Sequence, residues 1–246
     1  MPIRVIPILL IENGKLVKSY KFNSKQYVGD PINACKVFNE KEVDELIVLD
    51  ISATKTGNIP YDIIEEIAGE CFMPVTYGGG VSKIEHIKTI TSLGIERVAI
   101  NSFGIENPHF FTRAVSKFGS STIVASVDVT NTHEVFTRNG THKNFRSLHD
   151  VLTVLEDNEI GEILIQSIDK DGTLNGYDFS LLEFVLSHTS IPITMCGGAA
   201  GIDDFLQATK MGAAGVAAGA QFVFYGPLRA VLINYLNKQE LESLQS

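Results

Sequence analysis

The chain contains no tryptophan, only three cysteines and no apolar run long enough to cross a membrane. The cysteines lack a CxxC spacing, and the six histidines lack the i, i+4 pairing of a helical zinc site. We therefore expect no bound metal and no cofactor. Positive charge is also scarce, because 20 Lys and Arg face 29 Asp and Glu. The resulting net charge of -9 opposes general binding to nucleic-acid phosphates.

The first residues, Met1 to Arg4, contain neither a basic leader nor a small-residue cleavage site. This start predicts a cytoplasmic protein with no membrane partner. With 246 residues, 44% of them hydrophobic, the chain has enough apolar material for one large core. We expect residues 1–246 to form a single domain.

Two segments of the chain, MPVTYGGG at 73–80 and IPITMCGG at 191–198, are nearly the same and lie 118 residues apart. The same offset pairs Val98-Ala99 with Val216-Ala217, and Leu10 with Asp128. A repeat of this length indicates a duplicated half-fold, with halves of about 1–118 and 119–246.

Apolar, β-branched runs of strand length alternate with segments of helical period along the whole chain. The runs lie at 3–10, 46–49, 75–77, 97–100, 122–127, 162–167, 191–195 and 215–218, and the helical segments at 32–40, 62–70, 84–93, 108–118, 148–157, 179–188 and 202–211. This alternation, with the half-chain repeat, predicts a (β/α)8 TIM barrel built from two half-barrels. A doubly wound open sheet is the alternative, but neither half contains a dinucleotide fingerprint.

Insertions follow the first and fifth expected strands. Residues 12–30 are polar and lysine-rich, which is typical of a mobile cover over a barrel mouth. The segment EVFTRNGTH at 134–142 predicts a hairpin that turns at Asn139-Gly140. This hairpin could equally be a decoration without a functional role.

Polar residues where strands end are the first candidates for chemistry, because barrel active sites form there. Asp128 ends an otherwise apolar strand, and a buried carboxylate is costly unless it is bonded or used in catalysis. We expect Asp128 to transfer protons; the alternative is a structural carboxylate. The other candidates at strand ends are Asp50, Asn101, Ser102, Gln166, Ser167, Asp169 and Asp171.

Glycines follow the third, seventh and eighth expected strands, where backbone N–H groups can approach phosphate oxygens, and Asn101-Ser102 follows the fourth. One predicted phosphate site combines Gly79 and Gly80 with Asn101 and Ser102; the other combines Gly197, Gly198, Gly219 and Ala220. These pairs face each other across a barrel, which favours a ligand with a phosphate at each end.

Charged residues stand at the opposite, N-terminal ends of the expected strands. Arg4, Glu45, Arg97 and Glu162 would form a ring of ion pairs at the barrel floor. On these residues alone, the ring could be merely a stabilising salt-bridge cluster.

Together, these motifs resemble the cyclase subunit of imidazole glycerol phosphate synthase, which works with a glutaminase subunit in histidine biosynthesis. The resemblance covers almost the full chain. It is carried by DELIVLDI at 44–51, YGGGV at 77–81, VAINS at 98–102, EILIQSIDKDGT at 162–173, GYD at 176–178 and CGGA at 196–199. The isomerase of the preceding histidine step shares the two-phosphate barrel but fits SIDKDGT at 167–173 less well.

The resemblance implies a heterodimer in which a glutaminase docks at the barrel floor. Its ammonia would enter through the charged gate formed by Arg4, Glu45, Arg97 and Glu162. At the mouth, a ribonucleotide with two phosphates would be converted to imidazole glycerol phosphate and aminoimidazole carboxamide ribotide. The positions expected to surround this ligand, besides the two phosphate sites above, are Lys18, Asp50, Asp171 and Gly172.

The chain departs from this family at its first strand. Where the family has an aspartate that pairs with the one retained as Asp128, this chain has Leu10, which cannot transfer a proton. General acid–base catalysis typically contributes roughly 10²–10⁴-fold in rate. Gln166 also replaces a usual threonine, and Ala220 a frequent serine. Two alternatives to cyclase activity therefore stay open: a paralog that conducts ammonia to a separate amidotransferase for cell-surface sugars, or a non-catalytic activator of the glutaminase that binds a phosphorylated ligand.

Overall fold

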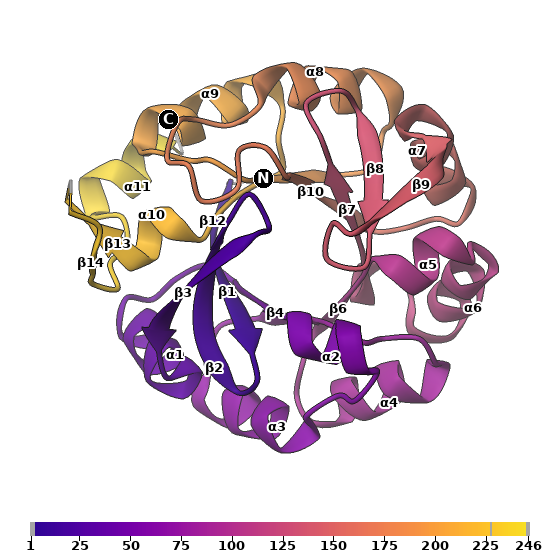
Figure 1. The fold of residues 1–246 in the computed structure, drawn as a ribbon, viewed down its shortest axis with the longest axis horizontal. Helices are drawn as coiled ribbons and strands as arrows, with labels where there is room; N and C mark the ends of the chain where they lie inside the picture. Colours follow the sequence, from indigo (N-terminus) through magenta and orange to yellow (C-terminus); the bar gives the residue numbers. More distant parts are fainter. Residues whose placement is uncertain (1–2, 227, 245–246) are drawn as a thin grey trace.

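A closed barrel of parallel strands forms the centre of the molecule (Figure 1). The computed structural model describes residues 3–226 and 228–244, so residues 1–2, 227 and 245–246 of the expected domain lie outside it. Within the described residues the eight barrel strands are β1 (Arg4–Glu12), β4 (Leu46–Asp50), β5 (Val75–Gly78), β6 (Arg97–Ile100), β7 (Ile123–Val129), β10 (Glu162–Ser167), β11 (Ile193–Cys196) and β12 (Gly215–Ala218). Parallel pairing of β12 with β1 and of β10 with β7 closes the sheet. The predicted (β/α)8 barrel is confirmed.

Helices surround the barrel and cover its outer surface (Figure 1). The longer ones are α1 (Pro31–Glu40), α3 (Tyr61–Glu70), α4 (Ile84–Ser92), α6 (His109–Phe118), α7 (Leu148–Asp157), α8 (Phe179–His188), α9 (Ile202–Met211) and α11 (Lys238–Leu244). Short helices that the periodicity does not reveal directly follow strand ends: α2 (Ile51–Thr56), α5 (Ser102–Glu106) and α10 (Ala220–Val223). A small hairpin of β13 (Phe224–Tyr225) and β14 (Ala230–Val231) comes after α10. No helix among the described residues has the length and apolar character needed to span a membrane.

The alternation of side chains along the barrel strands divides the apolar core. Side chains on the outer face of the strands, such as Leu9 and Val48, pack with the helices in a large cluster. Inward-facing side chains form a separate cluster on the barrel axis, made of Ile6, Ile8, Ile47, Ala99, Val124, Leu164, Cys196 and Ala217. The barrel interior is therefore apolar and filled by side chains.

The two halves of the chain repeat each other in structure. Strand β5, helix α4 and strand β6 begin at residues 75, 84 and 97, and β11, α9 and β12 begin at 193, 202 and 215, each 118 residues later. Each half also has an antiparallel hairpin after its first barrel strand. The first consists of β2 (Lys15–Tyr20) and β3 (Ser24–Gly29), and the second of β8 (Glu134–Thr137) and β9 (His142–Ser147).

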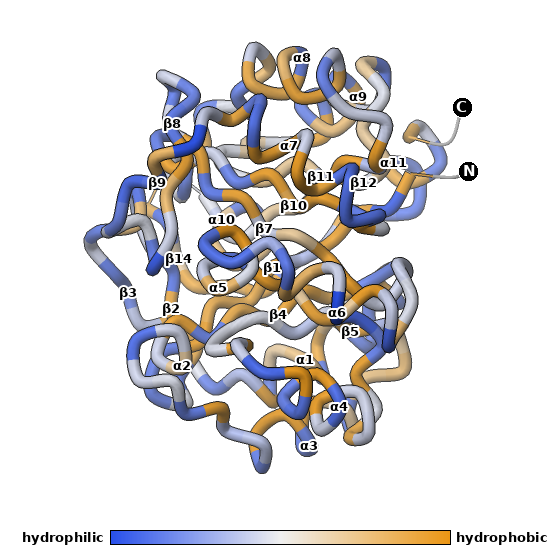
Figure 2. The backbone as a smooth tube through the Cα atoms, turned by 90° about the vertical axis from the view of Figure 1, so that its right-hand side faces the viewer, coloured by the Kyte–Doolittle hydropathy of each residue, from blue (hydrophilic) through white to orange (hydrophobic). Residues whose placement is uncertain are grey.

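The two hairpins project from the same end of the barrel, the mouth, while helix α11 lies toward the other end (Figure 2). The tip of the β2–β3 hairpin reaches the loop after β10, where the Lys21 N–H donates to the Asp171 carbonyl at 2.9 Å. The tip of the β8–β9 hairpin reaches α2, where Asn139 Nδ2 donates to the Ile51 carbonyl at 3.0 Å. Segment 12–30, expected as a polar cover, is thus an ordered pair of strands, and the expected turn at Asn139-Gly140 is present.

Side chains at several helix starts satisfy the backbone N–H groups that a first turn leaves free. Asp30 accepts from the Asn33 N–H at the start of α1, and Asp178 accepts from the Leu181 N–H at the start of α8. Ser147 forms a capping box with Asp150 at the start of α7. These caps fix the residues at which α1, α7 and α8 begin.

The capping box leads to a test of this local rule. Ser147→Ala removes the side-chain acceptor for the Asp150 N–H and should lower the free energy of unfolding by about 1 kcal/mol. Urea denaturation followed by circular dichroism measures the change. Ser116→Ala, at an exposed position within α6, is the matched control and should have a much smaller effect. Equal effects of the two substitutions would contradict the capping assignment.

Candidate functional site

A cavity of 630 Å³ opens at the barrel mouth. Its apolar wall includes Leu10, Leu49, Ala99 and Phe22, and its polar wall includes two expected strand-end carboxylates, Asp50 and Asp128. Other predicted residues on its surface are Gly79, Gly80, Asn101, Ser102 and Gln166. The structure therefore brings the predicted phosphate site of the first half-barrel to the same cavity as Asp128.

Asp128 lies near the end of β7, opposite Gln166 of β10 and Phe136 of β8. Its side chain is buried, with 7% exposure. Burial raises the pKa of Asp128 to about 7; the nearby Asp171 carboxylate adds to the rise, and a hydrogen bond from Asn101 opposes it. A carboxyl group with this pKa exists in both protonation states near neutral pH, which suits general acid–base chemistry.

Leu10 occupies the equivalent place on β1. It pairs with Leu49 of β4 and Val17 of β2, and it lines the same cavity as Asp128. The 118-residue repeat therefore holds in space as well as in sequence. Where the family resemblance implies a second carboxylate, the cavity wall is an isobutyl group.

Asp50 is engaged with the backbone. Its Oδ1 accepts from the N–H groups of Ser52 and Ala53 at 2.8 and 2.9 Å, which caps the short helix α2. Burial raises the pKa of Asp50, and these backbone hydrogen bonds oppose the rise. Its clearest role in this structure is to hold the start of α2 against the cavity.

The predicted phosphate site after β5 and β6 lies on the cavity wall. Gly79 has φ 134°, and a Cβ atom there would come within 2.3 Å of the Asp50 carbonyl oxygen, so only glycine fits. After β6, Asn101 Nδ2 donates to the Ser126 carbonyl at 2.9 Å, and Ser102 Oγ donates to Asn101 Oδ1 at 3.0 Å. The Ser102 hydroxyl group and the glycine backbone thus stand beside the same open space.

At the predicted phosphate site after β11 and β12, the β2–β3 hairpin lies against Gly219, whereas Gly197 and Gly198 pack against the end of β10 and the loop after it. Gly197, Gly198, Gly219 and Ala220 do not line the cavity. A Cβ atom on Gly219 would lie 2.3 Å from Nζ of Lys18, whose ammonium group donates to the Ile8 carbonyl. Burial lowers the pKa of Lys18 to about 8, with Asp171 opposing the change. Lys18 is therefore buried beside Gly219, where the resemblance implies ligand.

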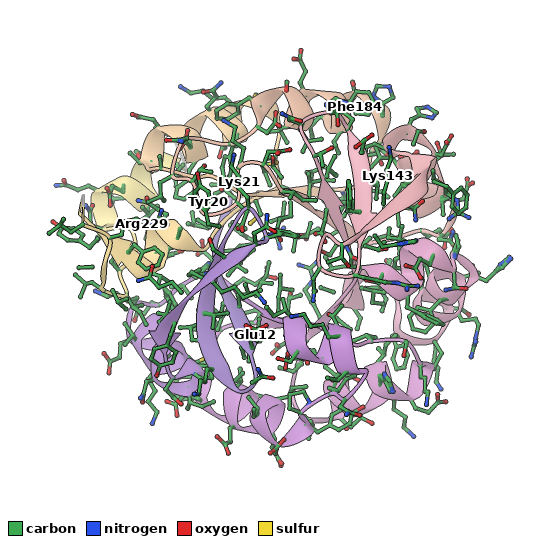
Figure 3. All side chains as sticks on the ribbon, in the orientation of Figure 1. Glu12, Tyr20, Lys21, Lys143, Phe184 and Arg229 are labelled. Carbon is green, nitrogen blue, oxygen red and sulfur yellow. The ribbon has the colours of Figure 1, made fainter. Side chains whose placement is uncertain are left out.

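Asp171 and Gly172 hold this cover in place. Asp171 Oδ2 accepts from the Ser19 hydroxyl at 2.6 Å and from the Phe22 N–H at 3.3 Å. Gly172 packs so closely on the Ser19 carbonyl that a Cβ atom would come within 2.2 Å of it. Figure 3 labels Tyr20 and Lys21 on this hairpin, above the loop that it contacts. Asp171 and Gly172 therefore hold the β2–β3 hairpin in this structure, a role that the sequence did not indicate.

At the barrel floor, ion pairs join the four expected charged residues in a ring. Arg4 contacts Glu45 at 2.7 Å and Glu162 at 2.8 Å, while Arg97 contacts the same two carboxylates at 3.3 and 2.7 Å. Thr76 donates to Glu45 and Thr194 to Glu162, at 2.8 and 2.5 Å.

Both glutamates of the ring are buried. Burial by itself would raise the pKa of Glu162, but Arg97 and Arg4 bring it below its ordinary value.

The apolar cluster on the barrel axis connects this ring to the cavity. At its lower end, Ile6 and Arg4 both lie next to Gly215, within 3.3 Å of where its Cβ atom would be. At its upper end, Ala99 belongs to both the cluster and the cavity wall. Apolar side chains therefore occupy the axis between the ring and the cavity.

Several cavity residues were not predicted from sequence. They come from the β8–β9 hairpin and the short helices α2 and α5: Arg138, Asn139, Thr141, Thr54, Lys55, Phe103 and Glu106. The repeat could have indicated the hairpin residues. At the 118-residue offset, segment 134–142 corresponds to 16–24, which lies within the polar insertion after the first strand. No group of three or more metal-ligating side chains occurs in the part of the chain that the structure describes.

The family described as histidine biosynthesis protein matches residues 4–228, nearly the whole chain. The chain belongs to this family. A Pseudomonas aeruginosa protein provisionally named imidazole glycerol phosphate synthase subunit hisF2 is 45% identical, over 97% of this chain and 98% of that protein. A Leptospira interrogans protein provisionally named subunit HisF is 43% identical over 98% of both. Subunit HisF of Dictyoglomus turgidum is 34% identical over 90% of both, so the resemblance to the cyclase subunit is confirmed.

The raised pKa of Asp128 leads to a pH-dependent prediction. The unfolded carboxyl group ionises near pH 3.8 and the folded one near 7, so wild-type stability should fall as pH rises between these values, by up to roughly 4 kcal/mol. Asp128→Asn removes this loss. The stability of the variant relative to wild type, measured by urea denaturation, should rise from pH 5 to 7 and then level off. A difference that is constant with pH would contradict the assignment.

Proposed function

We propose that this chain is the barrel subunit of a glutamine amidotransferase of the imidazole glycerol phosphate synthase type. In this proposal it receives ammonia from a glutaminase at the floor and uses it at the mouth. The substrate is the doubly phosphorylated ribonucleotide of the family, and the products are imidazole glycerol phosphate and aminoimidazole carboxamide ribotide. The observation that carries the proposal is the continuous arrangement of ion ring, apolar interior and Asp128 cavity along one axis.

The ion ring supports entry of ammonia at the floor. Its carboxylates are buried, and each contacts both arginines, so the ring closes the barrel floor against bulk water. This closure depends on the positions of only four side chains. Glutaminase docking would need to shift only Arg4 or Arg97, whose side chains are more exposed, at 29% and 16%, than those of the glutamates. The charges would then exclude ions while ammonia passes.

The cavity supports the synthase chemistry in part. Ammonia that leaves the apolar interior would meet a ligand held over Asp128, and ring closure requires proton transfers that a carboxyl group with pKa about 7 can perform. Leu10 provides no second proton-transfer group. We therefore propose that native cyclase turnover is low, with Asp128 as its catalytic residue.

Restoring the missing carboxylate tests this directly. With ammonium salt and the family's ribonucleotide, Leu10→Asp should raise turnover about 10²-fold or more, since acid–base catalysis contributes roughly that much. Asp128→Asn should abolish the gain. Leu49→Asp, which places a carboxylate at the paired position of β4 on the same cavity wall, is the matched control and should not raise turnover. A wild-type chain without product, and no rescue by Leu10→Asp, would defeat the proposal.

The ring can be tested separately from the chemistry. Arg97→Ala removes contacts to both Glu45 and Glu162 and should open the floor, so that ammonia from the glutaminase escapes. Product formed with glutamine should fall several-fold relative to product formed with ammonium salt, in the Leu10→Asp background if wild-type turnover is too low. Arg113→Ala, an exposed arginine of α6 outside the ring, should leave the ratio unchanged. The role of the gate fails if Arg97→Ala leaves it unchanged as well.

A second candidate function is favoured by Leu10 itself. The chain would conduct ammonia to a separate amidotransferase for cell-surface sugars, which needs the floor ring and interior but no acid–base pair at the mouth. Relatives with numbered names, hisF2 of P. aeruginosa and hisF3 of Vibrio vulnificus, support the existence of such additional copies. Sugar-nucleotide genes beside this gene would support the second candidate. A complete histidine operon with this chain as its sole cyclase would count against it.

A further inference from the structure

The turn of the β8–β9 hairpin is held over the cavity in an unusual backbone conformation. Arg138, Asn139 and Gly140 have φ values of 55°, 57° and 74° in succession. Left-handed backbone is unfavourable for residues with a Cβ atom, and it concentrates at functional sites. The surrounding contacts must therefore fix this turn, and they do so from two sides.

On one side the turn is tied to the start of α5. The Arg138 N–H donates to Ser102 Oγ at 2.8 Å, and Ser102 belongs to the predicted phosphate site after β6. On the other side, Asn139 is tied to the Ile51 carbonyl, next to Asp50. The turn consequently spans the phosphate site from β6 to β4, and Arg138 and Asn139 both line the cavity.

Glu106 orients the Arg138 guanidinium group by two hydrogen bonds. Its Nε and Nη2 donate to the two carboxylate oxygens of Glu106 at 3.0 and 2.8 Å. The arginine side chain is 60% exposed, and an exposed ion pair of this kind contributes little to stability. A phosphate group offers the same two-pronged geometry, so the guanidinium group can bind it in the same manner.

The other half of the chain has a similar arrangement, with a lysine of its hairpin at the equivalent site, although the repeat itself pairs Arg138 with Tyr20. At the 118-residue offset Ser102 corresponds to Ala220, and the other hairpin places the Lys18 ammonium group next to Gly219, one residue before Ala220. The two hairpins also meet at equivalent positions, because a Cβ atom on Gly140 would lie 2.8 Å from the Phe22 ring. Each hairpin thus brings one cationic residue to the phosphate site of the neighbouring barrel strand.

We propose that Arg138 is a phosphate-binding residue that determines specificity at the site formed by Gly79, Gly80 and Ser102. On ligand binding, its guanidinium group moves from Glu106 to the phosphate, while Glu106 keeps its 2.9 Å hydrogen bond from Thr137. Glu106 competes with the phosphate for Arg138, because it occupies the Nε and Nη2 donors in the absence of ligand. This inference rests on the proposed function in one respect, the presence of a phosphate on the ligand.

The direct test measures the binding of inorganic phosphate and of the family's doubly phosphorylated ribonucleotide by calorimetry. Arg138→Ala should weaken binding of both by about 10- to 100-fold, since hydrogen bonds to charged groups contribute on that scale. Lys143→Ala is the matched control: it removes a cation from the same hairpin, labelled in Figure 3, that pairs with Glu134 and does not line the cavity. It should leave both affinities unchanged.

Two further variants keep the proposal falsifiable if Arg138→Ala unfolds the turn. Arg138→Lys retains the charge without the fork and should bind with intermediate affinity, whereas Glu106→Gln releases Arg138 and should bind phosphate several-fold more tightly than wild type. Wild-type affinity in the two Arg138 variants would overturn the proposal. If Arg138→Ala loses affinity for phosphate, this inference is supported. If in addition neither wild type nor Leu10→Asp turns over the ribonucleotide, the proposed function fails while this inference stands.

Discussion

Closure of the parallel sheet is the constraint on which the rest of this structure depends. Because β12 pairs with β1 and β10 with β7, alternate residues of every barrel strand face one axis that water does not reach. Polar groups on that axis must then be paired or placed near an end. Glu45 and Glu162 are paired with arginines at the floor, whereas Asp128 stands near the mouth with its pKa raised by burial. One constraint therefore produces both a floor closed by ion pairs and a buried carboxyl group with a raised pKa.

Duplication explains how the mouth is covered. Each half supplies a hairpin after its first strand, and each tip is fixed on a segment of the opposite half, at Asp171 for one and Ile51 for the other. The two covers meet where Phe22 contacts Gly140. They are not equivalent in effect, because the first one buries Lys18 over its phosphate site while the second leaves its site open to the cavity. The two predicted phosphate sites therefore differ in how the hairpins cover them.

The barrel could be predicted from sequence because burial on both faces leaves long apolar runs, and seven of its helices follow from 3.6-residue periodicity. Asp128 could be predicted as a carboxylate at an apolar strand end. The helix α2 could not, since six residues show no period and its cap, Asp50, looks like any strand-end acid. The pairing of Arg138 with Glu106 also escapes sequence, because a hairpin joins side chains 32 positions apart.

In the proposed function, ammonia conduction and proton transfer are separable because the floor ring and the cavity lie at opposite ends of the same strand. Arg4 begins β1 and Leu10 lies six residues later, roughly 20 Å along an extended chain. Loss of a carboxylate at position 10 therefore leaves the geometry of the floor ring intact, and the apolar side chains between, Ile6 and Ile8, need no adjustment. Selection could thus remove the cyclase chemistry of a duplicated copy without disturbing the route to its mouth. In the proposed function, Leu10 thus changes the chemistry at the mouth while Arg4, Glu45, Arg97 and Glu162 still form the ion-pair ring at the floor.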